Sequence, residues 1–456
     1  MLKRFAAAAM LAAFALLSPG HASEAGDIAR KHLYEGTLAA GLEELTPLQD
    51  ALHQDAWFGM GLLTFVQGVE HLAQSFHRYG LAAPETGPMG PPLLLPVPAN
   101  PHPEPLDYQT FRGILETLVS DMDRARALLE DAGRQGDYVV PLDLLKFRID
   151  INGDGKTEDA ESIGTVLTRA IGEDPAVFAP PPAPEVTAPP APAPDRKGPG
   201  DKASKGPAAP EAPIEPPAPV EAEVPAIPEA IIGFDRADAI WLAGYSQVLA
   251  AQADFLLAHD FETTFNATFH RLFPRSNLPM QEFSNGGMLM LDPASDNAIA
   301  DFVAAIHTIN WPVVEPERLK RVLTRFQAIT SLSRQNWQAI LAETDDNAEL
   351  IPNPRQTSLV PEGQVTDEII AAWMATLDTV DKILAGELLV PHWRFARGFD
   401  LKAWFETSTR TDFVMLLTGY DALPFLKDGP VATAESFAAG NRVFGDNFLG
   451  YAFWFN

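Results

Sequence analysis

Residues 55–79 read DAWFGMGLLTFVQGVEHLAQSFHRY, and the spacing of their large apolar side chains decides the fold class. These side chains recur every three or four positions, at Phe58, Leu62, Phe65, Val69, Leu72 and Phe76. That period places them on one face of an α-helix, and such a face is buried when the helix packs against its neighbours. Polar residues, among them Glu70 and His77, fall on the other faces.

The same period recurs on both sides of the middle of the chain, so the sequence predicts an all-α, multi-helix body. Further helices are expected at about 27–41, 107–133, 158–171, 235–258, 260–271, 295–308, 316–345, 366–386 and 411–421. A small hairpin is expected around Leu388 to Trp404, where apolar residues alternate before Gly398.

A proline-rich segment at 175–229 separates the two helical halves. It holds 18 of the 41 prolines of the chain and almost no aromatic residues. Proline lacks a backbone donor and fixes φ, so such a segment favours extended, solvated chain over a packed core. We expect a disordered linker between a helical half at 23–174 and a second helical half at 230–456, with the two halves packed together. Two separate domains are the alternative.

The N-terminus has the pattern of a secretory signal peptide at residues 1–22. Lys3 and Arg4 precede an apolar run from Phe5 to Leu17, and Gly20-His21-Ala22 forms a cleavage site. The run is too short to span a bilayer of about 30 Å, so no transmembrane anchor is expected after cleavage. These features predict a periplasmic or secreted protein.

Charge and cysteine content exclude several functions. Without Lys3 and Arg4, the 31 basic and 61 acidic residues give a formal charge of about −30. Nucleic acid is therefore not an expected partner, because phosphate binding needs the opposite sign. The chain has no cysteine, which excludes disulfides, thiol catalysis and cysteine-bound metals.

One twelve-residue stretch, DINGDGKTEDAE at 150–161, carries the pattern of a calcium loop. Calcium takes six to eight oxygen ligands, and a short loop supplies them from alternate side chains and a backbone carbonyl. Gly155 stands where the chain must turn sharply. The predicted ligands are Asp150, Asn152, Asp154, the Lys156 carbonyl oxygen, Glu158 and Glu161.

This stretch resembles the EF-hand loop, and more closely the single calcium loops of the dockerin type in secreted bacterial proteins. The resemblance covers only these twelve residues. Thr157 stands where paired EF-hands usually carry an aliphatic residue, and the sequence shows no second loop, so the site is expected to be solitary. The alternative is an acidic turn that binds no ion. As a whole, the chain resembles uncharacterised all-helical secreted bacterial proteins, and this resemblance adds no activity.

Outside the loop, the polar clusters have competing interpretations. Asp235 and Asp238 are expected to cap a helix. Trp393 is expected to anchor its segment in the core, while Arg394 pairs with a local acid; a site for an anion or a sugar is the alternative for this segment.

Two functions follow from these predictions. The first is an exported calcium-binding protein of the bacterial envelope with a structural or binding role. The alternative is an exported hydrolase whose cleft uses Glu70 or Asp238 with His77 or His392.

Overall fold

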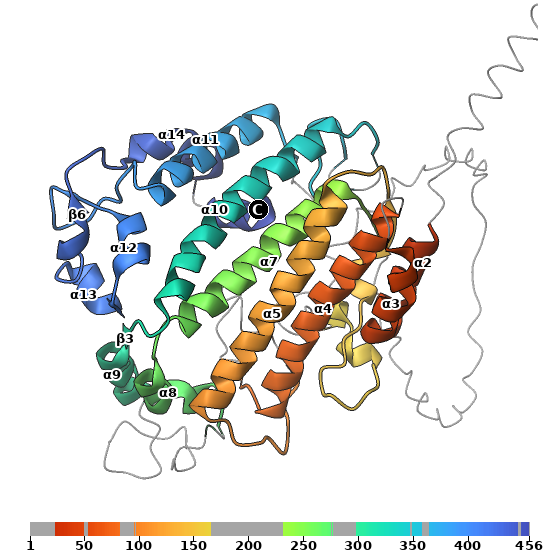
Figure 1. Cartoon of the computed structure of the whole chain (residues 1–456), viewed down its shortest axis with the longest axis horizontal. Coiled ribbons are helices and arrows are strands. Elements are labelled where there is room, and N and C mark those ends of the chain that lie inside the picture. The colour runs from red at the N-terminus through yellow and green to blue at the C-terminus, as the bar shows by residue number, and fades with distance from the viewer. Residues whose placement is uncertain are drawn as a thin grey trace, which may run out of the picture.

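The computed structural model describes residues 23–49, 53–82, 95, 97–165, 231–274, 276, 298–346, 349–357, 364–445 and 448–455. The expected signal peptide at 1–22 and the expected linker at 175–229 lie outside these residues. Within them the chain is mostly helical, as predicted, with a few short strands (Figure 1). None of the described helices combines the length and apolar content needed to cross a membrane.

Four long helices lie side by side and form the centre of the molecule (Figure 1). In spatial order they are α4 (Gln54–Arg78), α5 (Tyr108–Gly133), α7 (Arg236–Leu257) and α10 (Pro316–Ala342). Helix α5 begins where the Asp107 side chain accepts a hydrogen bond from the Thr110 amide at 2.7 Å. Asp235 and Asp238 form the predicted capping box at the start of α7. The apolar periodicity therefore located all four helices correctly.

The predicted helix at 27–41 is wrong, because two helices occupy this region. Helix α2 (Glu24–Glu35) ends at Gly36, whose φ of +66° is the left-handed conformation that glycine adopts at little cost. The chain then restarts as α3 (Leu38–Leu45) and ends in a 3-10 turn, η1 (Thr46–Leu48). Both helices pack on α4.

Three two-stranded antiparallel ladders join distant parts of the chain. They pair β1 (Val140–Asp143) with β2 (Ile231–Phe234), β3 (Asn310–Pro312) with β5 (Arg410–Asp412), and β4 (Gly398–Phe399) with β6 (Leu426–Lys427). The hairpin predicted around Leu388 to Trp404 is reduced to one bridge, in which Val390 and Phe399 exchange backbone hydrogen bonds of 2.9 and 2.8 Å. Sequence periodicity missed the β1–β2 pairing, since each strand has only four residues.

The remaining elements lie around the four-helix layer (Figure 1). They are η2 (Leu144–Lys146), η3 (Asp159–Glu161), α8 (Glu262–Thr268), η5 (Phe269–Arg271), α9 (Ala298–Thr308), α11 (Asp367–Leu384), α12 (Leu401–Thr407), α13 (Phe413–Thr418), η6 (Leu423–Phe425), η7 (Ala434–Phe437), α14 (Ala438–Phe444) and α15 (Phe448–Phe455).

The largest core cluster takes residues from both halves of the sequence. Phe58 and Leu129 come from the first half, whereas Phe234, Trp337 and Phe455 come from the second. The Phe58 and Phe234 rings stack with centroids 5.9 Å apart. Burial of large side chains such as these contributes about 1.5–3 kcal/mol each, so the shared core holds both halves in one body.

Candidate calcium loop and other polar sites

Residues 150–161 form a tight loop that begins after Ile149 and ends with the turn η3. Gly153 and Gly155 have φ of +73° and +78°, a conformation that is costly for residues with a Cβ. The segments that enter and leave the loop run antiparallel. The Ile149 amide donates to the Glu161 carbonyl at 3.3 Å, and the Ile163 amide donates to the Phe147 carbonyl at 2.8 Å. The two ends of the loop are therefore closed by backbone pairing.

The side chains at alternate positions bend back over the loop. Asp150 accepts hydrogen bonds from the amides of Gly153 at 2.8 Å and Asp154 at 3.2 Å through Oδ1, and from Gly155 at 2.9 Å through Oδ2. Asn152 accepts from the Asp154 amide at 2.8 Å, and Asp154 accepts from the Lys156 amide at 2.9 Å. These local bonds hold the alternating oxygens close to the chain of the loop.

Glu161 closes the loop from its far end. Its Oε1 accepts from the amides of Ile151 at 3.0 Å and Asn152 at 3.3 Å, and its Oε2 accepts from the Glu158 amide at 3.0 Å. The residue is only 4% exposed. A buried carboxylate is costly unless it is hydrogen-bonded and its charge is compensated, and here the first condition is met by three amides.

Helix α4 holds the first residue of the loop. The Asp150 amide donates to Glu70 Oε2 at 2.8 Å, and the Gln74 side-chain amide donates to the Asp150 carbonyl at 2.8 Å. Burial raises the pKa of Glu70 to about 7; the hydrogen bond from Asp150 opposes this rise, while the negative charges of Asp150 and Glu161 add to it. Thr157 fixes the other side of the loop to the end of α2, because its hydroxyl donates to the Glu35 carbonyl at 2.7 Å.

The exit helix predicted at 158–171 is wrong at its start, because 158–162 are not α-helical. A 3-10 turn covers Asp159–Glu161, and Ser162 is extended, with ψ of 145°. Residues 163–165 are helical, and 166–171 lie outside the described residues. The Glu161 carboxylate accepts a hydrogen bond from the Glu158 amide at the start of this turn. This N–H therefore has a partner although no full helix follows it here.

The loop carries more negative charge than its one ion pair among the described residues neutralises. It contains five carboxylates, at Asp150, Asp154, Glu158, Asp159 and Glu161, and Glu70 adds a sixth beside it. The ion pair recorded for the loop joins Arg148 to Asp159. A calcium ion fits this chemistry, since it prefers hard oxygen ligands. Among the described residues, however, no three histidine, aspartate or glutamate side chains already form a metal-binding group.

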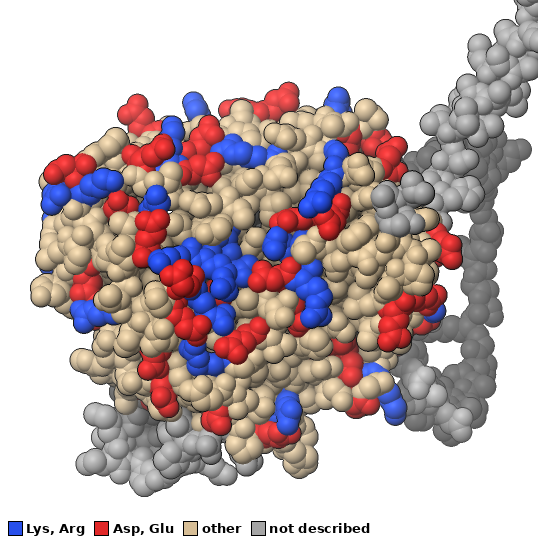
Figure 2. Space-filling model, viewed as in Figure 1, with Lys and Arg blue, Asp and Glu red and all other residues tan. Residues whose placement is uncertain are grey.

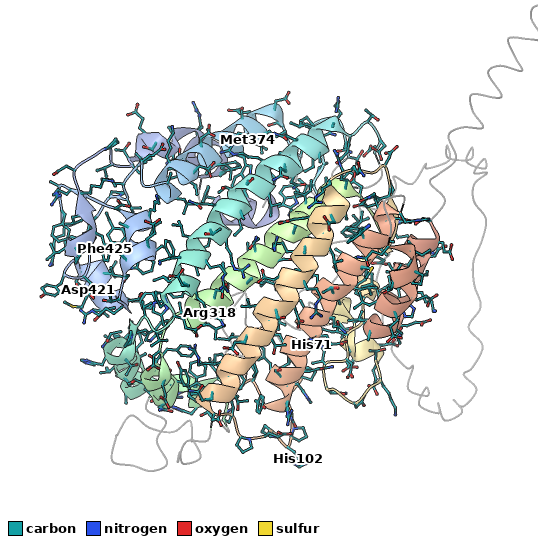
Figure 3. All side chains as sticks on the ribbon, in the orientation of Figure 1. His71, His102, Arg318, Met374, Asp421 and Phe425 are labelled. Carbon is teal, nitrogen blue, oxygen red and sulfur yellow. The ribbon has the colours of Figure 1, made fainter. Side chains whose placement is uncertain are left out.

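A cavity of about 550 Å³ lies beside the loop and the C-terminal half of α4. Its lining includes His71, His77, Arg78, His102 and Asn152. His71, labelled on α4 in Figure 3, lies 2.8 Å from Asp121 through its Nδ1, and this hydrogen bond raises the His71 pKa. Polar groups therefore surround the cavity, and the loop forms part of its wall.

Three of the four residues considered for hydrolysis have a structural partner, whereas His77 lines the cavity described above. Glu70 accepts from the Asp150 amide, and Asp238 accepts from the Asp235 amide at 3.0 Å. His392 Nε2 donates to the Leu416 carbonyl at 3.0 Å. These contacts tie the candidate side chains to three separate places, at the loop, at the start of α7 and beside α13.

The prediction for Trp393 is wrong, because its side chain lies on the surface with 72% of the residue exposed. Its indole N–H donates to the Leu417 carbonyl at 2.8 Å. The Arg394 guanidinium lies 4.8 Å from the centre of the indole ring, a cation–π arrangement that replaces the expected pairing with an acid.

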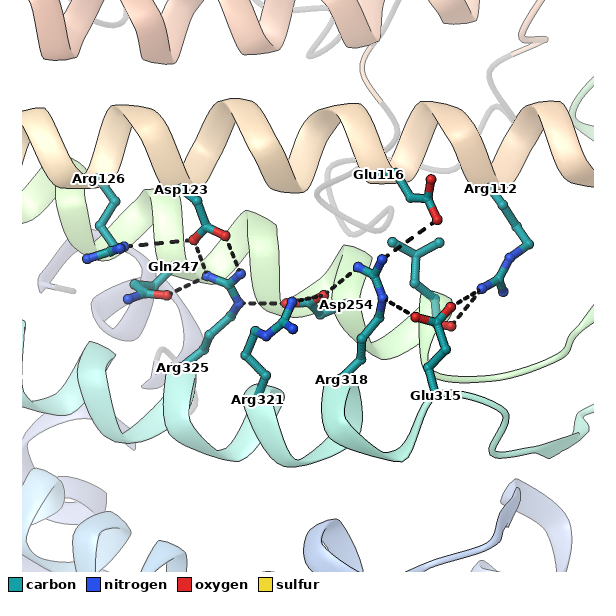
Figure 4. Close-up of polar contacts among 11 residues, drawn as sticks. Arg112, Glu116, Asp123, Arg126, Gln247, Asp254, Glu315, Arg318, Arg321 and Arg325 are labelled. Atoms are coloured by element: carbon teal, nitrogen blue, oxygen red, sulfur yellow. Dashed lines mark hydrogen bonds and ion pairs between the residues drawn. The ribbon is translucent and has the colours of Figure 1, made fainter.

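Sequence reasoning missed a charged cluster between α5, α7 and α10, which we call the arginine network (Figure 4). Asp254 is fully buried and accepts hydrogen bonds from Arg325 at 2.8 Å, Arg318 at 3.0 Å and Arg321 at 3.4 Å. Arg325 also binds Asp123 through two bonds of 2.7 and 2.9 Å. In Figure 2 the Lys and Arg side chains gather at the centre of this face, among acidic neighbours. The spacing of the three arginines along one helix face was the available signal.

A second acidic cluster, also missed, surrounds a cavity of about 310 Å³ beside the start of α7. Asp137, Asp235, Glu343 and Asp345 are among its lining residues. Burial and the nearby charge of Asp235 raise the pKa of Glu343 to about 9. Burial and the same neighbour also raise the pKa of Asp238 well above its usual range. In this cluster burial and the neighbouring carboxyl groups favour the protonated forms of Glu343 and Asp238, although Arg236 also lines the cavity.

Comparison with known proteins assigns no relationship to the chain. No family model matches it, and neither a curated protein nor a solved structure is similar to it. Its function is therefore argued from the geometry described above.

Proposed function

We propose that this chain is an exported calcium-binding protein of the bacterial envelope with a structural or binding role. One ion is held by the EF-hand-like loop at 150–161. The observation that supports this most directly is the group of carboxylates around Asp150: the negative charges of Asp150 and Glu161 both raise the pKa of Glu70, and the charge of His71 offsets this rise only in part. A divalent ion would supply the missing positive charge.

The ligands in this proposal are the predicted ones: Asp150, Asn152, Asp154, the Lys156 carbonyl oxygen, Glu158 and Glu161. Asp150, Asn152, Asp154 and Glu161 already accept backbone hydrogen bonds within the loop, so their oxygens are held near the chain that would surround the ion. The ion supplies charge neutralisation and cross-linking. The chain orients the ligands through Gly153, Gly155 and the contacts to α4.

The expected effect of calcium is local bracing of the fold. The loop contacts α4 through Glu70 and Gln74, and α2 through Thr157. An ion that rigidifies the loop therefore stabilises the junction of these helices. A solitary extracellular site binds with a dissociation constant of about 0.1–1 mM, and at about 1 mM calcium the tighter value stabilises the fold by about 1.4 kcal/mol.

Export is the second part of the proposal. Residues 1–22 supply the signal peptide pattern, and calcium sites of this weak class suit compartments where the ion is abundant. N-terminal sequencing of the protein recovered from the periplasm or medium should begin near Ser23. Recovery of an uncleaved chain in the cytoplasm would contradict export.

Titration calorimetry tests the ion site. The purified chain should bind about one calcium per molecule, and the double variant Asp150→Asn with Glu161→Gln should lose the binding. The matched control is Asp159→Asn, which removes a charge from the same loop at a residue that pairs with Arg148 and is not a proposed ligand. Equal loss in the control would show a general charge effect and count against the ligand set. Absence of calcium binding in the parent chain would refute the site.

A further inference from the structure

Two cavities share the side chain of His71 on α4. The larger, of about 550 Å³, is the cavity beside the calcium loop described above. The smaller, of about 300 Å³, lies between α4 and α5. Both are lined by His71, Ser75 and Ile114, so we call the two together the His71 groove (His71 in Figure 3). Cavities that hold small molecules have volumes of about 300–1,000 Å³, and both fall in this range.

A buried carboxylate orients His71. The ring Nδ1 lies 2.8 Å from Oδ2 of Asp121, a residue that is only 6% exposed. Gly68 lets the two helices approach here, since a Cβ added to it would lie 2.9 Å from the Asp121 Cβ. The carboxylate accepts the Nδ1 proton, which leaves Nε2 of the neutral ring with its lone pair. The partly exposed imidazole therefore offers a fixed hydrogen-bond acceptor to the groove.

The wall of the groove is held in place by bonds within the chain. The Asn100 side chain donates to the His77 carbonyl at 2.9 Å and accepts from the His102 amide at 2.8 Å, which ties the segment before α5 to the end of α4. The Gln74 side chain donates to the Asp150 carbonyl at 2.8 Å and keeps its own oxygen as a second acceptor. These groups are ordered without a ligand, so binding costs little conformational entropy.

The lining favours a neutral ligand over an ion. Among the described lining residues, the guanidinium of Arg78 and the carboxylate of Glu104 pair with each other at 2.8 Å. A cation therefore finds this carboxylate already paired. An anion would meet the negative charges of Glu70 and Asp150, which bind each other beside the same part of α4. The other polar side chains of the lining are imidazoles, amides and hydroxyls, which form hydrogen bonds to uncharged partners.

We propose that the His71 groove binds a neutral mono- or disaccharide. A sugar hydroxyl both donates and accepts a hydrogen bond, so it suits a lining that offers acceptors at His71 and Gln74 and an amide donor at Asn152. Ile114 and Leu72 supply an apolar surface for the C–H groups of the sugar ring. Ligand sites typically combine an apolar wall with a few placed polar groups. The inference goes beyond the calcium site and does not depend on an ion in the loop.

Nuclear magnetic resonance of the full chain, labelled with ¹⁵N at histidine, gives the direct test. Glucose, galactose, N-acetylglucosamine and maltose are the probes, and the measurement is made in chelator at a pH above the His71 pKa. At least one sugar should shift the Nε2 signal of His71 in a saturable way while the ring keeps its proton on Nδ1. His307, an exposed histidine on α9 that lines neither cavity, is the internal control and should not respond.

Two variants test the groove by calorimetry with the sugar that binds most tightly. His71→Phe removes the acceptor and should weaken binding by about tenfold, the effect of one hydrogen bond to a buried ligand. His307→Phe is the matched control and should bind as the parent chain does.

Replacement of Gly113 blocks the smaller cavity without loss of the fold. A Cβ added to Gly113 meets nothing within 4 Å, so Gly113→Leu fills space between α4 and α5 without a clash. This variant should lose maltose binding at concentrations that saturate the parent chain, whereas Gly113→Ala should keep it. Both should remain folded, because α5 loses a glycine that weakens a helix.

Three results would overturn the proposal. An His71 signal that none of the four sugars moves at their highest soluble concentrations would remove the site. A larger response of His71 to acetate or phosphate than to any sugar, with a shift toward the doubly protonated ring, would assign the groove to an anion. Equal maltose binding by Gly113→Leu and the parent chain would place the sugar elsewhere. Since these measurements are made in chelator, failure of the calcium site would leave them unchanged.

Discussion

The calcium loop and the arginine network both concentrate carboxylates, but they differ in where the compensating charge comes from. In the network, Asp254 is fully buried, and three arginines from α10 reach it. In the loop, Glu161 is 4% exposed and takes backbone amides as its partners. Amides satisfy hydrogen bonds but supply little net charge, so the chain compensates the charge of the loop less fully than that of the network, and in our proposal a calcium ion supplies the difference.

This difference separates a complete structural element from a binding element. A carboxylate whose cation belongs to the same chain contributes to the fold under all conditions. A carboxylate cluster without such a cation makes the stability of its region depend on the solution, through metal ions or protons. The cavity lined by Asp235 and Glu343 is a third case, in which protonation removes the repulsion.

The largest expected effect comes from breaking the network at Arg325. Arg325→Met leaves Asp123 without its two-bond partner and removes one of three arginines from Asp254. Asp254 keeps Arg318 and Arg321, so we expect a loss of about 1.5–3 kcal/mol in urea unfolding, less than for a fully uncompensated buried charge. The control is Arg334→Met on the same helix, because the ion pairs of Arg334 with Asp378 and Asp381 are partly exposed and should cost less than about 1 kcal/mol. Equal losses would remove the distinction between the network and ordinary surface pairs.

A smaller effect is expected from pH at the third cluster. The pKa of Glu343 is raised from 4.5 to about 9, so the folded state binds a proton that the unfolded chain releases above pH 4.5. The stability that this proton provides is complete below pH 4.5 and is lost as pH rises through 9. Glu343→Gln should flatten this fall and stabilise the protein by about 1–2 kcal/mol at high pH, after reduction by solvent screening. The exposed control Glu387→Gln should keep the slope of the parent chain, and an unchanged slope in Glu343→Gln would contradict the account.

Replacement of aspartate by asparagine should lower the free energy of unfolding in the network and raise it in the loop. Burial raises the pKa of Asp123, but the hydrogen bond and charge of Arg325 outweigh it and leave the pKa lowered, so Asp123→Asn should cost about 1 kcal/mol. Asp154→Asn in the loop should raise stability by at most about 0.5 kcal/mol in chelator, because it removes repulsion and keeps the oxygen that accepts from Lys156. Thermal unfolding of both variants in chelator gives the comparison. A loss of stability in both variants would mean that the negative charge of the loop is already compensated within the chain.

Local patterns in the sequence predicted what is decided locally. Apolar spacing located α4, α5, α7 and α10, and the capping by Asp235 and Asp238 was predicted from a stretch of four residues. The turns of the loop depend on bonds within twelve residues, which is why their spacing was visible in the sequence. Gly36 breaks the predicted helix at 27–41 because it adopts the left-handed C-cap conformation, and its lack of a Cβ leaves room for Thr157.

Contacts between distant residues were not predictable in the same way. Arg325 and Asp254 are 71 residues apart, and Glu70 and Asp150 are 80 residues apart, so neither pair leaves a periodic signal. Trp393 was expected in the core, whereas its indole N–H donates to the Leu417 carbonyl at the surface. The pairing of these polar groups depends on the order of the helices in the layer, which local sequence patterns do not reveal.

A crystal structure of the chain grown with calcium tests the central claim most directly. The account predicts one ion within the 150–161 loop, with oxygens of Asp150, Asn152, Asp154 and Glu161 at about 2.3–2.6 Å. Well-ordered density for the loop in saturating calcium, with the Asp150 and Glu161 carboxylates still bound only to backbone amides and no ion between them, would contradict it.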